Sequence, residues 1–376
     1  MEPIGYDKKK GSKLMQDKGV DILIASSSEN VFYTSGIPVG YAESNPILYV
    51  LFNQYPSIVI IPQDGEEALI TWQLFRSVES VSWVRKVVGI LSRSEALQRL
   101  ESLIEETGLP QDGTIGIESG MPYYQFYWLT KVFPDVKIRV SDDIFTDMRL
   151  EKSEEEIRRI KESTRIAEKT VETMIGYAKE GVSDTDLVRV ARRRIIDEET
   201  AGVNHITLGI GSSDPEYPKT GITMKKGDLV RFDVGAIHEG YCSDVARYAI
   251  VGTYDRSAET ANKLMIEVQR ACVDAIKPGV KPLDAVNAAY NVYRRGGGEA
   301  FFFLSIHSVG LSIEECTLYD TVLGASPIVF KKSMVIDVDC STVFPPQGLI
   351  GVGDPYLVTD SGCKELSTLE RRIYRV

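Results

Sequence analysis

Residues 225–252, KKGDLVRFDVGAIHEGYCSDVARYAIVG, contain two apolar-rich runs, LVRFDVGA and DVARYAIV, joined by a glycine-containing turn. The runs predict two strands of one hairpin. Asp233 interrupts the first run and Asp244 the second. A charged side chain inside a buried strand costs several kcal/mol unless it is paired or bound to a metal.

The predicted hairpin would bring the carboxylates of Asp233 and Asp244 opposite each other, where they repel. A divalent cation between the two carboxylates is the least costly way to relieve that repulsion. The alternative is that one or both aspartates face solvent from an edge strand. The pattern alone leaves both interpretations open.

The composition is that of an ordinary globular protein, with 43% hydrophobic and 26% charged residues. A chain of 376 residues is too long for one ordinary core, so two domains are expected. The net charge of −11 and the absence of a basic patch argue against nucleic-acid binding. No apolar run is long enough for a membrane span. The five cysteines are odd in number and lack CxxC spacing, which favours a reducing cytoplasm over disulfides or a zinc ribbon.

A change of pattern near residue 146 divides the chain. Residues 1–146 alternate short apolar strands with helical stretches, which indicates an α/β domain. Residues 147–376 begin with a long amphipathic helix at 153–181, for which Ser153 and Glu156 form a capping box. Strand-rich blocks follow, with further helices expected at 183–202, 257–276 and 282–298.

Asp233 and Asp244, with GYCS directly before the second, belong to a series of segments whose order is informative. The others are MQDKGVDILIASSSENVFYTSG (15–36), DMRLEKSEEEI (147–157), HSVGLSIEE (307–315), SMVIDVD (333–339) and GVGDPYLVTDSGCKELS (351–367). Together they resemble the creatinase, aminopeptidase P and prolidase family over nearly the whole chain. The resemblance implies an α+β protein with an N-terminal creatinase-like domain, residues 1–146. It also implies a C-terminal "pita-bread" domain, residues 147–376, in which outer helices cover a curved, mostly antiparallel sheet.

In that family two aspartates, one histidine and two glutamates hold up to two divalent ions. The resemblance implies that the ligands here are Asp233, Asp244, His307, Asp339 and Asp354. Asp339 is one methylene shorter than the family's glutamate. The last glutamate aligns with Gly353, so Asp354 would reach the site only if a bulge re-aimed its side chain. Carboxylates with one imidazole suit Mn²⁺, Co²⁺ or Zn²⁺.

The two histidines that assist catalysis in the family's peptidases have no counterpart at the matching positions. Glu314 stands at one of them. The other falls in DPEYPKTGITMKKGD (214–228), where Lys219 is the nearest match. His205, in a predicted strand, is a candidate replacement as proton donor. The competing interpretation of each residue is an ordinary structural or surface role.

The first functional interpretation is therefore an Xaa-Pro dipeptidase-like or aminopeptidase-like metal-dependent hydrolase with a non-standard active site. Its substrate would be a small peptide or another small molecule, and the resemblance implies a homodimer. The departures leave two alternatives open. One is a metal-free or one-metal creatinase-like hydrolase of a small non-peptide substrate, and the other is a catalytically silent binding protein.

Overall fold

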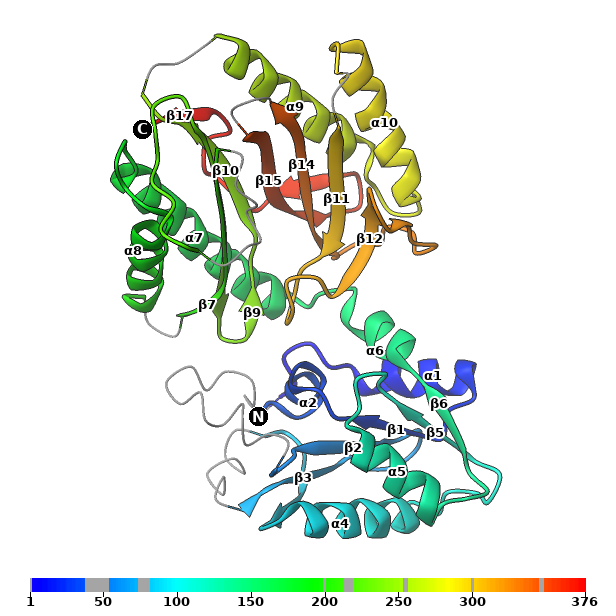
Figure 1. Ribbon diagram of the computed structural model, residues 1–376. Coiled ribbons are helices and arrows are strands. Elements are labelled where there is room, and N and C mark those ends of the chain that lie inside the picture. Colours follow the sequence, from blue (N-terminus) through cyan, green and yellow to red (C-terminus); the bar gives the residue numbers. More distant parts are fainter. Residues whose placement is uncertain are drawn as a thin grey trace. The chain divides into compact units, whose positions relative to one another are not determined.

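The computed structural model describes residues 2–37, 54–73, 82–198, 201–211, 219–252, 256–298, 301–344 and 348–376 (Figure 1). The chain divides into two compact units, Met1–Arg149 and Leu150–Val376. The expected boundary at residue 146 falls inside helix α6 (Asp142–Arg149), which packs against α1 (Lys8–Lys18) of the first unit. In the described ranges, no helix has the length and apolar character needed to cross a bilayer.

The first unit is built on a six-stranded mixed sheet in the order β4-β3-β2-β1-β5-β6. Its strands are β1 (Ile22–Ala25), β2 (Ile58–Pro62), β3 (Ala68–Trp72), β4 (Lys86–Ile90), β5 (Thr114–Ile117) and β6 (Lys137–Val140). Besides α1 and α6, its helices include α2 (Ser28–Ser35), α4 (Arg93–Glu106) and α5 (Tyr123–Val132). Buried Glu118 accepts hydrogen bonds from the Ser27 amide (2.8 Å) and the Asn30 side chain, which anchors the start of α2.

The second unit contains an eleven-stranded sheet in which β13-β12-β11-β14-β15-β10-β8-β7 are neighbours. The predicted hairpin is confirmed, because β8 and β10 pair antiparallel with Asp233 opposite Ala246. The strands are β7 (Ala201–Ile210), β8 (Leu229–His238), β9 (Tyr241–Cys242), β10 (Val245–Ile250), β11 (Phe302–Ser308), β12 (Cys316–Asp320), β13 (Gly324–Ala325), β14 (Val335–Phe344), β15 (Gly348–Val358), β16 (Cys363–Glu365) and β17 (Ile373–Arg375).

The helices of the second unit are α7 (Glu154–Tyr177), α8 (Asp184–Ile196), α9 (Arg256–Ala275) and α10 (Pro282–Arg295). Two of them begin directly after the expected capping residues, Ser153 for α7 and Ser183 for α8. The capping box of Ser153 and Glu156 is present at the start of α7. The expected extension of α8 to residue 202 is wrong, because Ala201 and Gly202 pair with β8 as part of β7.

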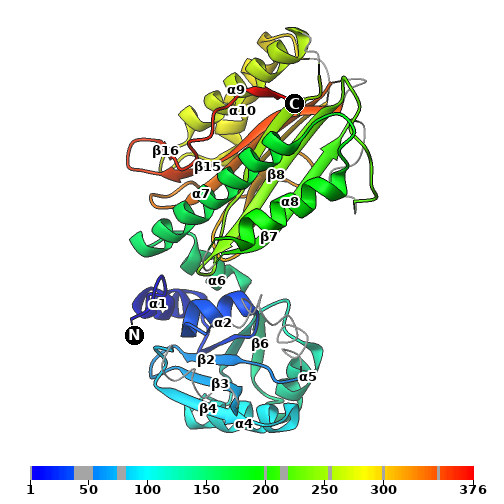
Figure 2. The ribbon, with the colours of Figure 1, turned by 90° about the vertical axis from the view of Figure 1, so that its left-hand side faces the viewer.

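All four of these helices pack on one face of the described sheet. α7 and α8, which run along the sheet in Figure 2, share a core with Phe232 and Val234 of β8. α9 and α10 share a second core with Val338 and Cys340 of β14. Successive side chains of a strand point to opposite faces. Asp233, between Phe232 and Val234, therefore points to the face without helices.

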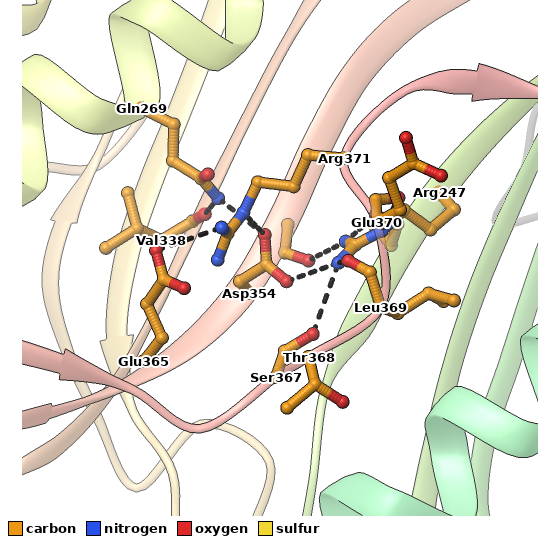
Figure 3. A network of polar contacts seen from close by, with 12 residues as sticks. Arg247, Gln269, Val338, Asp354, Glu365, Ser367, Thr368, Leu369, Glu370 and Arg371 are labelled. Carbon is orange, nitrogen blue, oxygen red and sulfur yellow. Dashed lines mark hydrogen bonds and ion pairs between the residues drawn. The ribbon is translucent and has the colours of Figure 1, made fainter.

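A buried ion-pair network lies on the helix-covered face (Figure 3). The Asp354 carboxylate accepts hydrogen bonds from Arg247 Nη2 (2.6 Å), Arg371 Nε (2.7 Å) and Gln269 Nε2 (3.2 Å). Arg247 also donates to the main-chain carbonyl of Leu369 at 2.6 Å. Arg247 and Asp354 are both essentially inaccessible to solvent. The network therefore ties residues 367–371 to the centre of the sheet.

We expect Arg247→Met to lower the free energy of unfolding by about 3–5 kcal/mol, because it removes one partner of a buried ion pair and leaves the charge of Asp354 without that partner. Urea unfolding followed by circular dichroism measures the change. Arg372→Met is the matched control, since the Arg372 side chain is 55% exposed and pairs with Glu370 at the surface. Equal unfolding midpoints for the two variants would contradict a stabilising role for the Arg247 network.

Candidate metal centre

Acidic and imidazole side chains gather on the face of the second unit's sheet that lies opposite the four described helices. Among the residues that the structure describes, two groups have ligand atoms within 4.8 Å of one another: His205, Asp233 and Asp244, and Asp244, His307 and Asp337. Asp244 belongs to both groups. The side chains come from β7, β8, β11, β14 and the residue before β10, so the curved sheet brings together residues that are far apart in sequence.

His205 lies on this face by strand alternation, because it pairs with Gly235 and Thr207 pairs with Asp233 in continuous register, and a bulge directly precedes it. Val203 pairs with Ala236 and His205 with Gly235, so Asn204 is the extra residue of a bulge. The His205 Nε2 atom lies 3.2 Å from Asp233 Oδ1 and 3.5 Å from Asp244 Oδ1. The ring also occupies the space above Gly235, where an added Cβ would lie 2.4 Å from it. Position 235 therefore requires glycine.

The charge of His205 depends on its two acidic neighbours. Burial opposes protonation of the ring, but the carboxylates of Asp244 and Asp233 outweigh burial and raise the pKa of His205 to about 10. Its Nδ1 atom lies 2.8 Å from the side-chain oxygen of Asn204. Both nitrogens of the imidazolium therefore have hydrogen-bond acceptors.

His307 is held in the tautomer that suits a metal ligand. Its Nδ1 atom lies 3.0 Å from the carbonyl oxygen of Ile313, which only accepts hydrogen bonds, so Nδ1 carries the proton. Burial lowers the pKa of His307 and favours the neutral ring. The unprotonated Nε2 then faces Asp244 Oδ2 at 3.6 Å and Asp337 Oδ2 at 4.0 Å. A backbone carbonyl that orients the ring in this way is common behind metal-binding histidines.

Asp337 is the functional candidate that the sequence reasoning missed. It pairs across the strands with His307 and is only 1% exposed, yet neither carboxylate oxygen has a hydrogen-bond partner. Burial and the nearby Asp244 carboxylate raise the pKa of Asp337 well above its usual range. The signal was its place two residues before Asp339, because alternation puts both on one face of a strand.

Asp233 and Asp339 share a cation from the protein itself. Arg231 Nη2 lies 2.6 Å from Asp233 Oδ2 and 3.2 Å from Asp339 Oδ2. Burial raises the pKa of Asp233, but Arg231 and His205 outweigh burial and hold it below its usual range. Burial raises the pKa of Asp339 to about 6, against the opposing effect of Arg231. Arg231 was not singled out from the sequence, although it lies two residues before Asp233 and so shares its face.

The structure does not bring the remaining candidates into the two groups. Asp354 points to the opposite face, because the register between β14 and β15 runs without a shift from Val335 to Phe344. The bulge on which its role as a ligand depends is therefore absent from this pair of strands. Glu314 is exposed. Lys219 Nζ donates to the main-chain oxygen of Leu208 at 2.6 Å, among its interactions.

Comparisons with known proteins agree with this architecture. The model of metallopeptidase family M24 matches residues 158–360, and that of the creatinase/prolidase N-terminal domain matches residues 9–150. The chain belongs to metallopeptidase family M24, with a creatinase-type N-terminal domain and a pita-bread domain. This confirms the expected α+β fold and the resemblance to the creatinase/prolidase family.

Similar proteins span the whole chain. An Xaa-Pro dipeptidase of Pyrococcus horikoshii is 26% identical over 371 residues, 97% of each chain. The crystal structure of a prolidase from Pyrococcus horikoshii OT3 superposes with a TM-score of 0.80 at 24% identity, covering 97% of this chain and 98% of that one. A dipeptidase from the same source gives a TM-score of 0.84 at 20% identity, covering 98% and 99%.

In metal-free protein we expect the His205 ring to stay protonated at pH 8, while the His307 ring is neutral. The raised pKa means that the charged His205 ring stabilises the fold fully below about pH 6.5, the usual histidine value. This contribution is lost as the pH rises through about 10. Nitrogen-resolved NMR of the imidazole rings measures both pKa values, since the chain has three histidines.

Two variants make this measurement specific. His205→Gln should remove the resonance that titrates at high pH. Gly235→Ala should move the ring away from its carboxylates and return its pKa toward the usual value, because the added methyl group occupies the space of the ring. A His205 resonance that titrates near pH 6.5 in the unaltered protein would show that the carboxylates do not hold the ring.

Proposed function

We propose that the protein is a divalent-metal-dependent hydrolase that cleaves small peptides of the Xaa-Pro class. The observation that carries this proposal is the group Asp244, His307 and Asp337. It combines a neutral imidazole with an unprotonated nitrogen and a buried carboxylate that has no hydrogen-bond partner. Membership of family M24 and the similarity to Xaa-Pro dipeptidases support the reaction class.

The donor set fits a divalent ion. Asp244, His307 and Asp337 would hold it, with Asp233 and His205 on its other side, and oxygen donors with one imidazole suit Mn²⁺, Co²⁺ or Zn²⁺. Such an ion supplies Lewis acidity toward a carbonyl group and makes water nucleophilic near neutral pH. Asp339 and Asp354 are not in the proposed ligand set, because their carboxylates bind Arg231 and the Arg247–Arg371 pair.

His205 is the side chain that we propose as proton donor. Its imidazolium lies against Asp233 and Asp244, at the edge of the proposed metal site, and its side chain keeps 19% of its surface accessible. A positioned general acid typically contributes about 10²–10⁴-fold to a rate. Glu314 and Lys219 remain weaker candidates for contact with substrate, because one is exposed and the other donates to the backbone of β7.

The test is hydrolysis of Xaa-Pro dipeptides by protein loaded with Mn²⁺, Co²⁺ or Zn²⁺, followed by release of free proline. We expect turnover that chelation removes. Asp244→Asn and His307→Gln should each lower kcat/KM by at least about 10²-fold, because each removes a proposed metal ligand. Asp360→Asn, an exposed change on the loop after β15, serves as the control and should retain full activity.

A second candidate function is a member of the family that binds small molecules or partners without peptide hydrolysis. It is favoured by Arg231, which already neutralises Asp233 and Asp339, and by Gly353, which offers no carboxylate beside them. Absence of turnover on every Xaa-Pro peptide, in protein shown to contain metal, would reject the peptidase proposal. The next substrates to assay would then be small non-peptide amides and amidines.

We further propose that the protein acts in the cytoplasm as a homodimer. The odd number of cysteines, all five of them unpaired in the structure, supports a reducing compartment. Light scattering after size-exclusion chromatography measures the mass of the assembly. A mass equal to that of a single chain would reject the dimer.

A further inference from the structure

Among the described residues, Asp337 gives the strongest indication that a bound ion is needed to complete the site. Its carboxylate is 1% exposed and both oxygens lack hydrogen-bond partners. A buried carboxylate without a partner costs more than an ordinary buried hydrogen-bonding group, because its charge has lost its hydration. Native proteins retain such a group where a ligand or an ion completes it. The Asp337 carboxylate lies beside Asp244 and the Nε2 atom of His307.

In the other group, of His205, Asp233 and Asp244, the first two residues already have partners within the chain. One oxygen of Asp233 contacts His205 Nε2 and the other accepts from Arg231 Nη2. The second nitrogen of His205 has the Asn204 side chain as its partner. A cation placed in this group would have to displace these contacts, whereas one beside Asp337 would displace none at that carboxylate.

Arg231 occupies the position between two carboxylates at which a second cation would otherwise be needed. Its Nη2 atom is within hydrogen-bonding distance of both Asp233 and Asp339, and its side chain is only 13% exposed. A guanidinium remains positively charged at every accessible pH and binds carboxylates in a fixed geometry. The strand geometry explains the placement, since residues 231 and 233 share one face of β8.

Strand β15 places no side chain opposite Asp339. Gly353 is opposite Asp339 on β15 and opposite Ala246 on β10. A Cβ added at Gly353 would lie 3.0 Å from the Ala246 side chain and 3.4 Å from the Asp339 carboxyl group. Strand β15 therefore contributes no side-chain ligand opposite Asp339, whose Oδ2 atom contacts Arg231.

We propose that this chain binds one divalent ion, at Asp244, His307 and Asp337, and that the Arg231 guanidinium replaces a second ion between Asp233 and Asp339. The inference rests on the proposed divalent-metal site but not on peptidase activity. It names Asp337 as a metal ligand and assigns Asp339 an ion-pairing role. The number of ions bound per chain is the quantity that distinguishes this arrangement from a two-metal site.

The first test compares two isosteric changes on the same face of one strand, Asp337→Asn and Asp339→Asn. Metal-free protein is titrated with Co²⁺ by isothermal calorimetry, and bound cobalt is counted by elemental mass spectrometry after gel filtration. We expect one Co²⁺ per chain in the unaltered protein and in Asp339→Asn. Asp337→Asn should bind Co²⁺ at least about 10²-fold more weakly, since loss of a direct ligand weakens binding more than loss of a side chain that only orients a ligand.

The outcomes separate this inference from the proposed function. Two Co²⁺ per chain in the unaltered protein, or none, would overturn the single-ion site whatever the peptidase assay shows. Unchanged affinity in Asp337→Asn together with a loss in Asp233→Asn would move the ion to the other group and also overturn it. One Co²⁺ per chain that depends on Asp337, in a protein without turnover on Xaa-Pro peptides, would support the metal site and reject the peptidase.

The second test replaces the cation itself. Arg231→Gln leaves Asp233 and Asp339 without their shared charge, so we expect the variant to melt at a lower temperature and to bind a second Co²⁺ that restores its stability. Arg231→Lys keeps the charge and should still bind one ion. If Arg231→Gln fails to fold without metal, recovery of its circular dichroism spectrum on refolding with Co²⁺ is the supporting result. A stoichiometry of one in Arg231→Gln, or no recovery, would overturn the role of Arg231.

Discussion

Alternation of side chains across a single eleven-stranded sheet is the constraint on which the rest of the second unit depends. One face packs its apolar residues beneath α7, α8, α9 and α10, and the other carries the acidic residues and both histidines of the candidate site. A shift of one residue in any of these strands would exchange the two faces. The unbroken register of β14 with β15 and of β8 with β10 therefore secures the core and the site together.

The protein manages the charge on its two faces in different ways. On the helix-covered face, Asp354 is satisfied by two arginines and a glutamine, so its carboxylate needs no outside ion. On the other face, the chain supplies Arg231 for two of the carboxylates and His205 for contacts with Asp233 and Asp244. Asp337 contacts neither of these cationic side chains within hydrogen-bonding distance, so the carboxylate without a partner lies beside His307.

The sequence was sufficient for the features that depend on local patterns. Apolar runs interrupted by Asp233 and Asp244 predicted the hairpin that carries them, and the capping box predicted the start of α7. The contact of Arg231 with Asp339 joins residues 108 positions apart, and no local pattern specifies it. The family resemblance pointed to Asp339 as a ligand and not to Asp337, although the two residues are two positions apart and share one face of the strand. The Asp354 side chain points away from the site because β14 and β15 pair without a bulge and successive side chains alternate between faces.

The Arg247 network also means that the sheet of the second unit can be completed only late in synthesis of the chain. Arg247 binds Asp354, which lies 107 residues later, and the backbone of residues later still. Strand β10, beside Asp244, has neighbours in β15 and β17, both of which leave the ribosome long after it. Contacts of such long range are formed slowly. At a synthesis rate of about 5–20 residues per second, several seconds pass between synthesis of Arg247 and synthesis of its partners, and until then the sheet cannot be completed around it.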